Sequence, residues 1–211
     1  IEVKFASGDD LASFDQLIDE NTKAVFCESI GNPAGNIIDL EGLAQIAHKH
    51  GVPLIVDNTV ASPALCRPFE HGADIVVHSL TKYIGGHGTT IGGMIVDSGK
   101  FDWVANKNRF PMLNEPDPSY HDVVYTEALG AAAYIGRCRV VPLRNTGAAL
   151  SPHSSFLIMQ GLETLCLRME RHCENALKVA EYLSAHDKVN WVNYAALPDS
   201  KYNELCQKLT H

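Results

Sequence analysis

The sequence predicts an α/β fold, with a mostly parallel sheet flanked by helices. Short apolar runs alternate with segments of helical periodicity through the first half of the chain. The middle positions of these runs are apolar without strict alternation, which is typical of strands buried on both faces. Hydrophobic residues make up 45% of 211 residues and charged residues 20%, so the chain has the composition of a soluble globular protein. This content excludes global disorder.

Each element of the first half has a local signal. Between the first two predicted strands, Asp39 is placed to cap a helix from Leu40 to about His50, and Gly51 is placed to end it. The predicted strands are residues 24–28, 53–57, 73–79 and 92–97. The apolar positions of the helix that share one face, which we expect to be buried, are Leu40, Leu43, Ala44 and Ala47.

The second half is predicted to contain an irregular segment, a long helical region and the start of a smaller domain. Residues 106–119 are rich in Pro and Asn and are expected to form an ordered excursion over the surface or a subunit contact. Ser151-Pro152 predicts the start of a helical region reaching about residue 185, bent or divided at Gly161. Residues 189–192 are expected to begin a strand of a smaller domain. The predicted parts are 1–150 (part of the large domain), 151–185 (connecting helices) and 186–211 (the incomplete start of a C-terminal α/β domain).

Charge and composition disfavour several classes of protein. Seventeen Lys and Arg against 25 Asp and Glu give a net charge of −8, so we expect no nucleic-acid partner. No apolar run approaches the roughly 20 residues of a membrane span. The start at Ile1 has no signal-peptide pattern and is not Met, so we expect an internal piece of a longer protein. Six scattered cysteines without a C-x-x-C pair indicate reduced thiols and a cytoplasmic protein.

The histidines and cysteines give no pattern for a metal site. Ten histidines include no H-E-x-x-H motif, so we expect no metal. His48 and His50, two apart on a helix, point to different faces. Cys166 and Cys173 can share one helix face, where buried apolar thiols are favoured over a redox pair.

Reactive side chains follow two predicted strands, at the edge where open α/β sheets bind ligands. Asp57 ends one strand, and Lys82 comes shortly after another, in a run that also holds Ser79 and Thr81. Each alone has an ordinary interpretation as a turn-capping acid, a solvated lysine or loop hydroxyls. Together they meet the needs of pyridoxal 5′-phosphate (PLP): an amine for a Schiff base, hydroxyls for a phosphate, and a carboxylate that keeps a pyridine nitrogen protonated.

Longer motifs resemble the trans-sulfuration (Cys/Met metabolism) family of PLP-dependent enzymes, of the PLP-dependent transferase fold type I. The run after the lysine, GGHGT at 85–89, is similar to the O-acetylhomoserine sulfhydrylase (aminocarboxypropyltransferase) branch, where cystathionine synthases and lyases usually carry Asn-Gly-His-Ser. The matching motifs are ESIGNP at 28–33, VDNT at 56–59, HSLTKY at 78–83, SP at 151–152, GLETL at 161–165 and RMERH at 168–172.

The resemblance implies a role for individual residues. Lys82 matches the Schiff-base lysine, which is also the catalytic proton carrier. Asp57 matches the partner of the pyridinium, and Asn32 matches an asparagine near the phenolic oxygen of the cofactor. Ser79 and Thr81 match the hydroxyls that bind the phosphate.

The resemblance also implies an activity. It is PLP-dependent γ-replacement, which converts O-acetyl-L-homoserine and sulfide to L-homocysteine and acetate in methionine biosynthesis. The alternatives are cystathionine γ-synthase, methionine γ-lyase, O-succinylhomoserine sulfhydrylase, or an inactive fragment. The hypothesis of an inactive fragment arises because the family's ring-stacking Tyr and carboxylate-binding Arg lie in regions without a match here. The implied partners are a small amino-acid substrate and sulfide, and the complete protein is expected to be a homotetramer, a dimer of dimers.

Overall fold

The centre of the fold is a four-stranded sheet with the strand order β1-β2-β3-β4. In this computed structural model, which describes residues 1–210, β1 (Val25–Glu28), β2 (Leu54–Asp57) and β3 (Ile75–Ser79) are parallel. β4 (Gly93–Asp97) runs antiparallel to β3. The predicted mostly parallel sheet is therefore confirmed, and each strand lies inside its predicted run.

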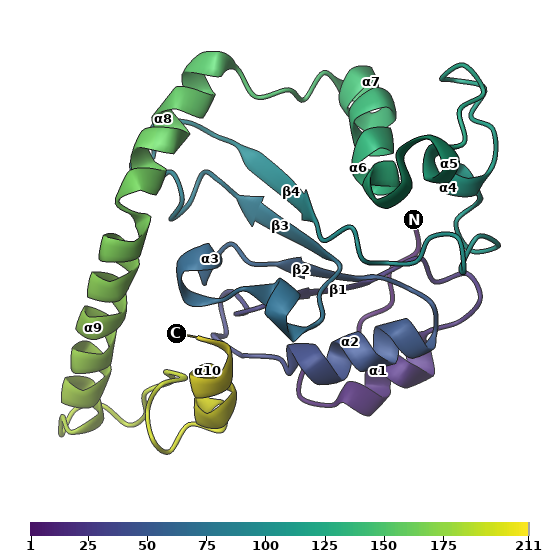
Figure 1. The fold of residues 1–211 in the computed structure, drawn as a ribbon. Coiled ribbons are helices and arrows are strands. Elements are labelled where there is room, and N and C mark those ends of the chain that lie inside the picture. The colour runs from purple at the N-terminus through teal and green to yellow at the C-terminus, as the bar shows by residue number, and fades with distance from the viewer. Residues whose placement is uncertain (211) are drawn as a thin grey trace.

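Two helices cover one face of the sheet, α1 (Leu11–Leu17) and α2 (Leu40–Lys49), as Figure 1 shows. The Asp39 side chain caps α2 by accepting a hydrogen bond from Gly42 N at 3.3 Å. Gly51, with a φ of +65°, ends the helix in the left-handed region that glycine favours. The predicted buried face of α2 is confirmed residue by residue: Leu40, Leu43, Ala44 and Ala47.

The opposite face of the sheet carries a second core. Successive side chains of a strand point to opposite faces. Leu54 and Val56 therefore join the α2 core, while Ile55 packs into the second cluster with Ile75. The short elements of the region that covers this face are α4 (Pro111–Asn114), α5 (Tyr125–Leu129), η2 (Gly130–Ala132), α6 (Ala133–Cys138), η3 (Arg139–Leu143) and α7 (Arg144–Thr146).

The Pro- and Asn-rich segment at 106–119 is ordered, as predicted, but it is not only a surface excursion. Phe110 and Leu113 are buried in the second core. Trp103 packs edge-on against Phe110, with 5.0 Å between the ring centroids. Aromatic side chains bury a large apolar area, so these rings make up much of the packing on this face of the sheet.

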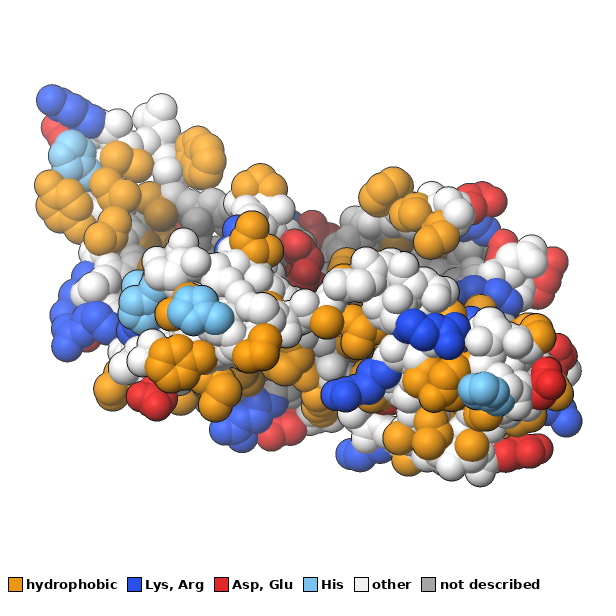
Figure 2. Space-filling model, turned by 90° about the horizontal axis from the view of Figure 1, so that it is seen from above, with side chains coloured by type: hydrophobic (Ala, Val, Ile, Leu, Met, Phe, Trp, Pro, Cys, Tyr) orange, Lys and Arg blue, Asp and Glu red, His pale blue; other side chains and the backbone are white. Residues whose placement is uncertain are grey.

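Strand β4 departs from the prediction of burial on both faces. It is the last strand in the sheet order, and its residues Met94 and Ile95 are 42% and 47% exposed. Phe156 and Met159 of the neighbouring helix α8 (Pro152–Glu163) are also exposed. Figure 2 shows hydrophobic side chains dispersed over the face seen from above. An apolar strand is buried on both faces only where helices cover both, which the sequence of the strand does not encode.

The predicted long helical region is two helices that run along one side of the sheet (Figure 1). α8 begins at the predicted place, with the Ser151 side chain accepting from Ser154 N. α9 (Leu165–Ser184) follows after Thr164, so the division lies three residues beyond the predicted Gly161. Between β2 and β3 lie α3 (Ser62–Leu65) and η1 (Pro68–His71).

The expected strand at 189–192 is absent from the described residues. Trp191 is exposed there, and the chain goes on to α10 (Asn203–Leu209) instead. Tyr202 and Leu209 are buried in the same core as α2, and Lys208 Nζ donates to Glu41 Oε2 at 2.7 Å. This segment therefore packs on the sheet domain, and the assignment of 186–211 to a separate domain stays a prediction.

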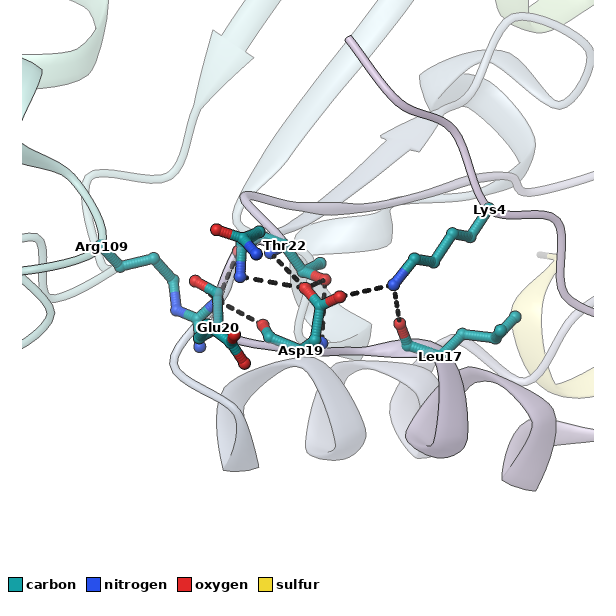
Figure 3. Close-up of polar contacts among 7 residues, drawn as sticks. Lys4, Leu17, Asp19, Glu20, Thr22 and Arg109 are labelled. Atoms are coloured by element: carbon teal, nitrogen blue, oxygen red, sulfur yellow. Dashed lines mark hydrogen bonds and ion pairs between the residues drawn. The ribbon is translucent and has the colours of Figure 1, made fainter.

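A polar cluster ties the start of the chain to the turn before β1 (Figure 3). Lys4 Nζ forms an ion pair with Asp19 and also donates to Leu17 O. The Lys4 ammonium, with the Thr22 hydroxyl, lowers the pKa of Asp19 to about 2. Arg109 Nη1 donates to the carbonyl oxygens of Asp19 and Thr22, so residues far apart in sequence share this turn.

The histidines of α2 contact carboxylates, and the two cysteines considered as a pair lie on α9. His48 Nε2 lies 2.8 Å from Asp74 Oδ2, and His50 Nε2 lies 2.6 Å from Asp15 Oδ1. Cys166 is exposed, which contradicts the prediction of two buried thiols, because α9 turns that side outward. Within residues 1–210, no group of three or more His, Cys, Asp or Glu is placed to hold a metal ion, and no helix is long and apolar enough to cross a membrane.

Asp74 is a structural carboxylate, and we expect Asp74→Ala to destabilise the fold. Its Oδ2 accepts from Leu54 N at 2.8 Å and contacts His48, and the residue is buried. Removing it leaves a buried amide unsatisfied, which costs about 1.5–3 kcal/mol for hydrogen bonds to a charged group. Urea denaturation measures the loss. The control is Asp187→Ala, whose side chain is 88% exposed and which should change stability by less than about 0.5 kcal/mol; equal losses in both variants contradict the prediction.

Candidate active site

The predicted site residues lie on elements that meet at one edge of the sheet. Asp57 is the last residue of β2, and Ser79 is the last residue of β3. Asn32 lies in the loop after β1, and Thr81 and Lys82 lie in the turn after β3. Because β1, β2 and β3 are parallel, their carboxyl ends share this edge, where α/β sheets bind ligands.

A buried polar network fixes the end of β2 beneath Asp57. Ser29 N donates to Asp57 O at 3.0 Å, and Ser29 Oγ donates to Asn58 Oδ1 at 2.7 Å. Asn58 Nδ2 in turn donates to Cys66 O at 2.8 Å. Ser29 and Asn58 are both buried, so each bond is protected from competition with water. The backbone that carries Asp57 is therefore rigidly placed.

Thr59 connects the ends of two strands, and the sequence reasoning missed it. Its backbone N donates to Asp57 Oδ1 at 2.9 Å, which orients the carboxylate. Its Oγ1 accepts from Ser79 N at 2.8 Å, across to β3. One residue thus links the end of β2, at Asp57, to the end of β3, at Ser79. The signal that could have found it is its place in the VDNT motif, two residues after Asp57.

The hydroxyl of Thr81 contacts the backbone before β4. Gly92 N donates to Thr81 Oγ1 at 3.0 Å, and the hydroxyl lies 3.3 Å from Gly92 O. The expectation that Ser79 and Thr81 both present hydroxyls to a phosphate stays a prediction. What the geometry shows is that Thr81 joins the Lys82 turn to the last strand.

Lys82 is exposed and lines a cavity of about 990 Å³. The structure brings Asn32 and Thr59 to the same cavity, and Asn32 N donates to Glu28 Oε2 at 2.9 Å. Asp57, Ser79 and Thr81 lie at the same edge of the sheet but are not among the residues that line this space. The other wall belongs to α9, through Leu167, Arg168, Arg171 and His172.

Cysteine chemistry does not compete with the lysine at this edge. Burial raises the pKa of the Cys27 thiol to about 12 and that of the Cys66 thiol to about 11. Both thiols stay protonated at neutral pH, and the thiolate is the reactive form. Burial also lowers the pKa of His78, which precedes Ser79 on β3. A neutral histidine there adds no positive charge beside Asp57.

The turn that carries Lys82 packs closely on the helices beyond it. A Cβ added to Gly161 of α8 would lie 2.0 Å from Gly85 O, so the helix and the turn are in contact backbone to backbone. We expect Gly161→Ala to displace this turn and to cost about 1–3 kcal/mol, the range for overpacking. Thermal or urea denaturation measures the stability.

The matched control for this change is Gly136→Ala, also within a helix. There the added Cβ would meet Leu129 Cδ1, the end of a side chain that is 46% exposed and free to rotate away. A loss at Gly136 as large as that at Gly161 would show that helix context, and not the backbone contact, sets the cost.

This fold and the lysine at the carboxyl edge of its strands define a class of protein. The whole chain, residues 1–211, matches the family described as Cys/Met metabolism PLP-dependent enzymes, and the chain belongs to that family. Its α/β sheet has the arrangement of fold type I, as in the solved structures that match it.

Individual relatives cover nearly the whole chain. It is 56% identical over 209 residues to a homocysteine synthase of Schizosaccharomyces pombe, covering 99% of this chain and 49% of that protein. It is 46% identical over 216 residues to an O-acetyl-L-homoserine sulfhydrylase of Leptospira meyeri, covering 99% of this chain and 48% of that protein.

A solved structure agrees with the sequence matches. A protein of Campylobacter jejuni assigned as an O-acetylhomoserine (thiol)-lyase superposes with a TM-score of 0.91 at 43% identity, covering 97% of this chain and 51% of that one. That crystal contains N′-pyridoxyl-lysine-5′-monophosphate. The chain thus spans about half the length of the curated relatives it matches.

Proposed function

We propose that the protein carrying this chain catalyses PLP-dependent γ-replacement, converting O-acetyl-L-homoserine and sulfide to L-homocysteine and acetate. The observation that carries the proposal is the placement of Lys82 at a large cavity, with Asp57 at the end of the adjacent strand. The names of the relatives supply the substrate, since they are homocysteine synthases and O-acetyl-L-homoserine sulfhydrylases.

The chemistry of the residues present fits PLP. The edge of the sheet offers an amine, a carboxylate and hydroxyls, which are the groups that an aldehyde, a pyridine nitrogen and a phosphate require. The cavity of about 990 Å³ is within the size range of cofactor sites. The residues that would hold the cofactor are Lys82, Asp57, Ser79, Thr81 and Asn32. When bound, PLP supplies an electron sink for negative charge at the substrate Cα.

The chain's own residues then have separate tasks. Lys82 Nζ would hold the cofactor covalently and would take and return the proton at the substrate Cα. Asp57 would hold a proton on the pyridine nitrogen, with its carboxylate kept in place by Thr59 N. Asn32, on the cavity wall opposite α9, would orient the ring through its amide. In the overall reaction the bond from Cγ to acetate breaks and a bond from Cγ to sulfur forms.

The proposal extends to assembly and location. We propose a homotetramer, a dimer of dimers, in the cytoplasm. Support for the cytoplasm comes from the six cysteines, all of which are free thiols. Light scattering of the purified protein checks the assembly, and a monomer would contradict it.

Substrate assays test the proposed reaction. The full-length protein, loaded with PLP, is given O-acetyl- or O-succinyl-L-homoserine with sulfide or cysteine, and products are identified by mass. Homocysteine from the acetyl ester and sulfide supports the proposal. Turnover only with cysteine indicates a cystathionine synthase, and turnover only of the succinyl ester indicates its sibling sulfhydrylase. Either result, or no turnover of any pair, contradicts it.

A further inference from the structure

One side chain of α9 connects the Lys82 turn to the junction of α8 and α9. Arg168 Nη1 donates to Tyr83 O at 2.8 Å, and its Nη2 donates to Gly161 O at 2.8 Å. The same Nη2 reaches Ile84 O at 3.5 Å, and Nε donates to Thr164 Oγ1 at 3.1 Å. A single guanidinium thus joins the turn after Lys82 to the α8–α9 junction, two parts of the chain more than 70 residues apart.

The turn is in close contact with this guanidinium and with the two helices. A Cβ added to Gly86 would lie 2.6 Å from Arg168 Cζ, so the cation lies flat against the turn. Leu80 and Ile84 of the same turn are buried in one cluster with side chains of the two helices: Ile158, Leu165 and Met169. The position of the turn is therefore set by α8 and α9 as much as by β3.

These contacts act on the backbone of Lys82 itself. Lys82 N donates to Ser79 O at 3.2 Å, and Gly86 N donates to Lys82 O at 2.8 Å. The next two carbonyls in the chain, of Tyr83 and Ile84, are the ones that Arg168 binds. Lys82 is thus held from its own turn on one side and from Arg168 on the other.

We propose that Arg168 is a positioning residue, which holds the backbone of Lys82 so that its Nζ reaches the cofactor and the substrate Cα. This rests on the proposed function. A long lysine side chain amplifies any tilt of its backbone, and displacement of a reacting group by about 1 Å can cost on the order of 10²-fold in rate. Only arginine has a planar fork of donors that can serve several carbonyls at once, which a lysine ammonium cannot reproduce.

The variants Arg168→Met and Arg168→Lys test the proposal in the full-length protein. The control is Lys178→Met, which removes one cation from the exposed face of the same helix, where Lys178 pairs with Glu174. Three readouts are taken: the rate of borohydride-trapped pyridoxyl labelling of Lys82 at fixed PLP, kcat and KM for O-acetyl-L-homoserine, and the melting temperature.

We expect Arg168→Met to slow labelling of Lys82 and to lower kcat by about 10-fold or more, with KM changed by less than about twofold. Arg168→Lys should recover part of both, and Lys178→Met should match the wild type. Wild-type labelling and kcat in a folded Arg168→Met variant would overturn the proposal. Unfolding of both Arg168 variants would also overturn it, in favour of a purely structural role.

Labelling separates this proposal from the proposed function. If the wild type labels Lys82 but turns over no ester, the γ-replacement reaction is wrong, while the labelling rates of the Arg168 variants still decide the positioning role. If the wild type does not label Lys82 at all, the proposed cofactor site fails and the positioning role fails with it.

Discussion

Replacement of Lys82 by alanine is expected to abolish pyridoxyl labelling at this position and to reduce turnover by about 10³-fold or more. The change removes both the amine that would hold the cofactor and the group that would move the Cα proton, and general acid–base catalysis alone is worth about 10²–10⁴-fold. Lys82 is exposed at the cavity, so its loss should leave the melting temperature nearly unchanged. Peptide mapping after borohydride reduction and steady-state kinetics measure the two effects.

The matched control is Lys107→Ala. Lys107 is also exposed, but it lies in the segment that covers the face of the sheet opposite α1 and α2. It should keep both the label on Lys82 and the rate. A Lys82→Ala variant that retained normal turnover would refute the assignment of Lys82. Labels spread over many lysines of the wild type would refute it too, because a specific site gives one label.

Asp57→Asn is expected to lower kcat/KM by about 10²-fold or more, the size of loss when one preorganised charge-stabilising group is removed. The amide keeps the size of the side chain, and its oxygen can still accept from Thr59 N, so the fold should be unaffected. What is lost is the negative charge that keeps a pyridine nitrogen protonated. The label on Lys82 should therefore persist while turnover falls, which distinguishes this variant from Lys82→Ala.

Asp102→Asn is the control for Asp57→Asn. Asp102 also accepts a hydrogen bond from the backbone N two residues ahead, Val104 N at 3.1 Å, but it follows β4, which runs antiparallel to β3 and so ends at the opposite edge of the sheet from Asp57. The two changes are thus alike in local geometry and differ in place. Equal activity losses in both, or no loss at Asp57, would contradict the assigned role.

Local patterns were enough to predict the parts of the fold that depend on neighbours in sequence. Helix α2 illustrates this, because its cap at Asp39, its end at Gly51 and its buried face all follow from residues within one helix length. The four strands follow in the same way from short apolar runs. Asp57 and Ser79 were predicted at the ligand-binding edge because strand ends in a parallel sheet meet there.

Contacts between distant segments decided the rest. Thr59 bonds to Ser79, and Arg168 bonds to Tyr83, across 20 and 85 residues, and neither pair leaves a periodic signal. Gly161 looked like a hinge from its own helix, yet its lack of a side chain serves the contact with Gly85. The exposure of β4 and the path of 189–192 depended on what covers each segment.

The sequence by itself therefore determined the four strands, helix α2, the start of α8 and the chemistry of the residues at the strand ends, because propensity, capping and periodicity are local. Only the tertiary structure decided which of those residues share a cavity and what holds the Lys82 turn in place. The physical reason is that side-chain reach and backbone approach between segments are set by packing, which a linear pattern does not contain.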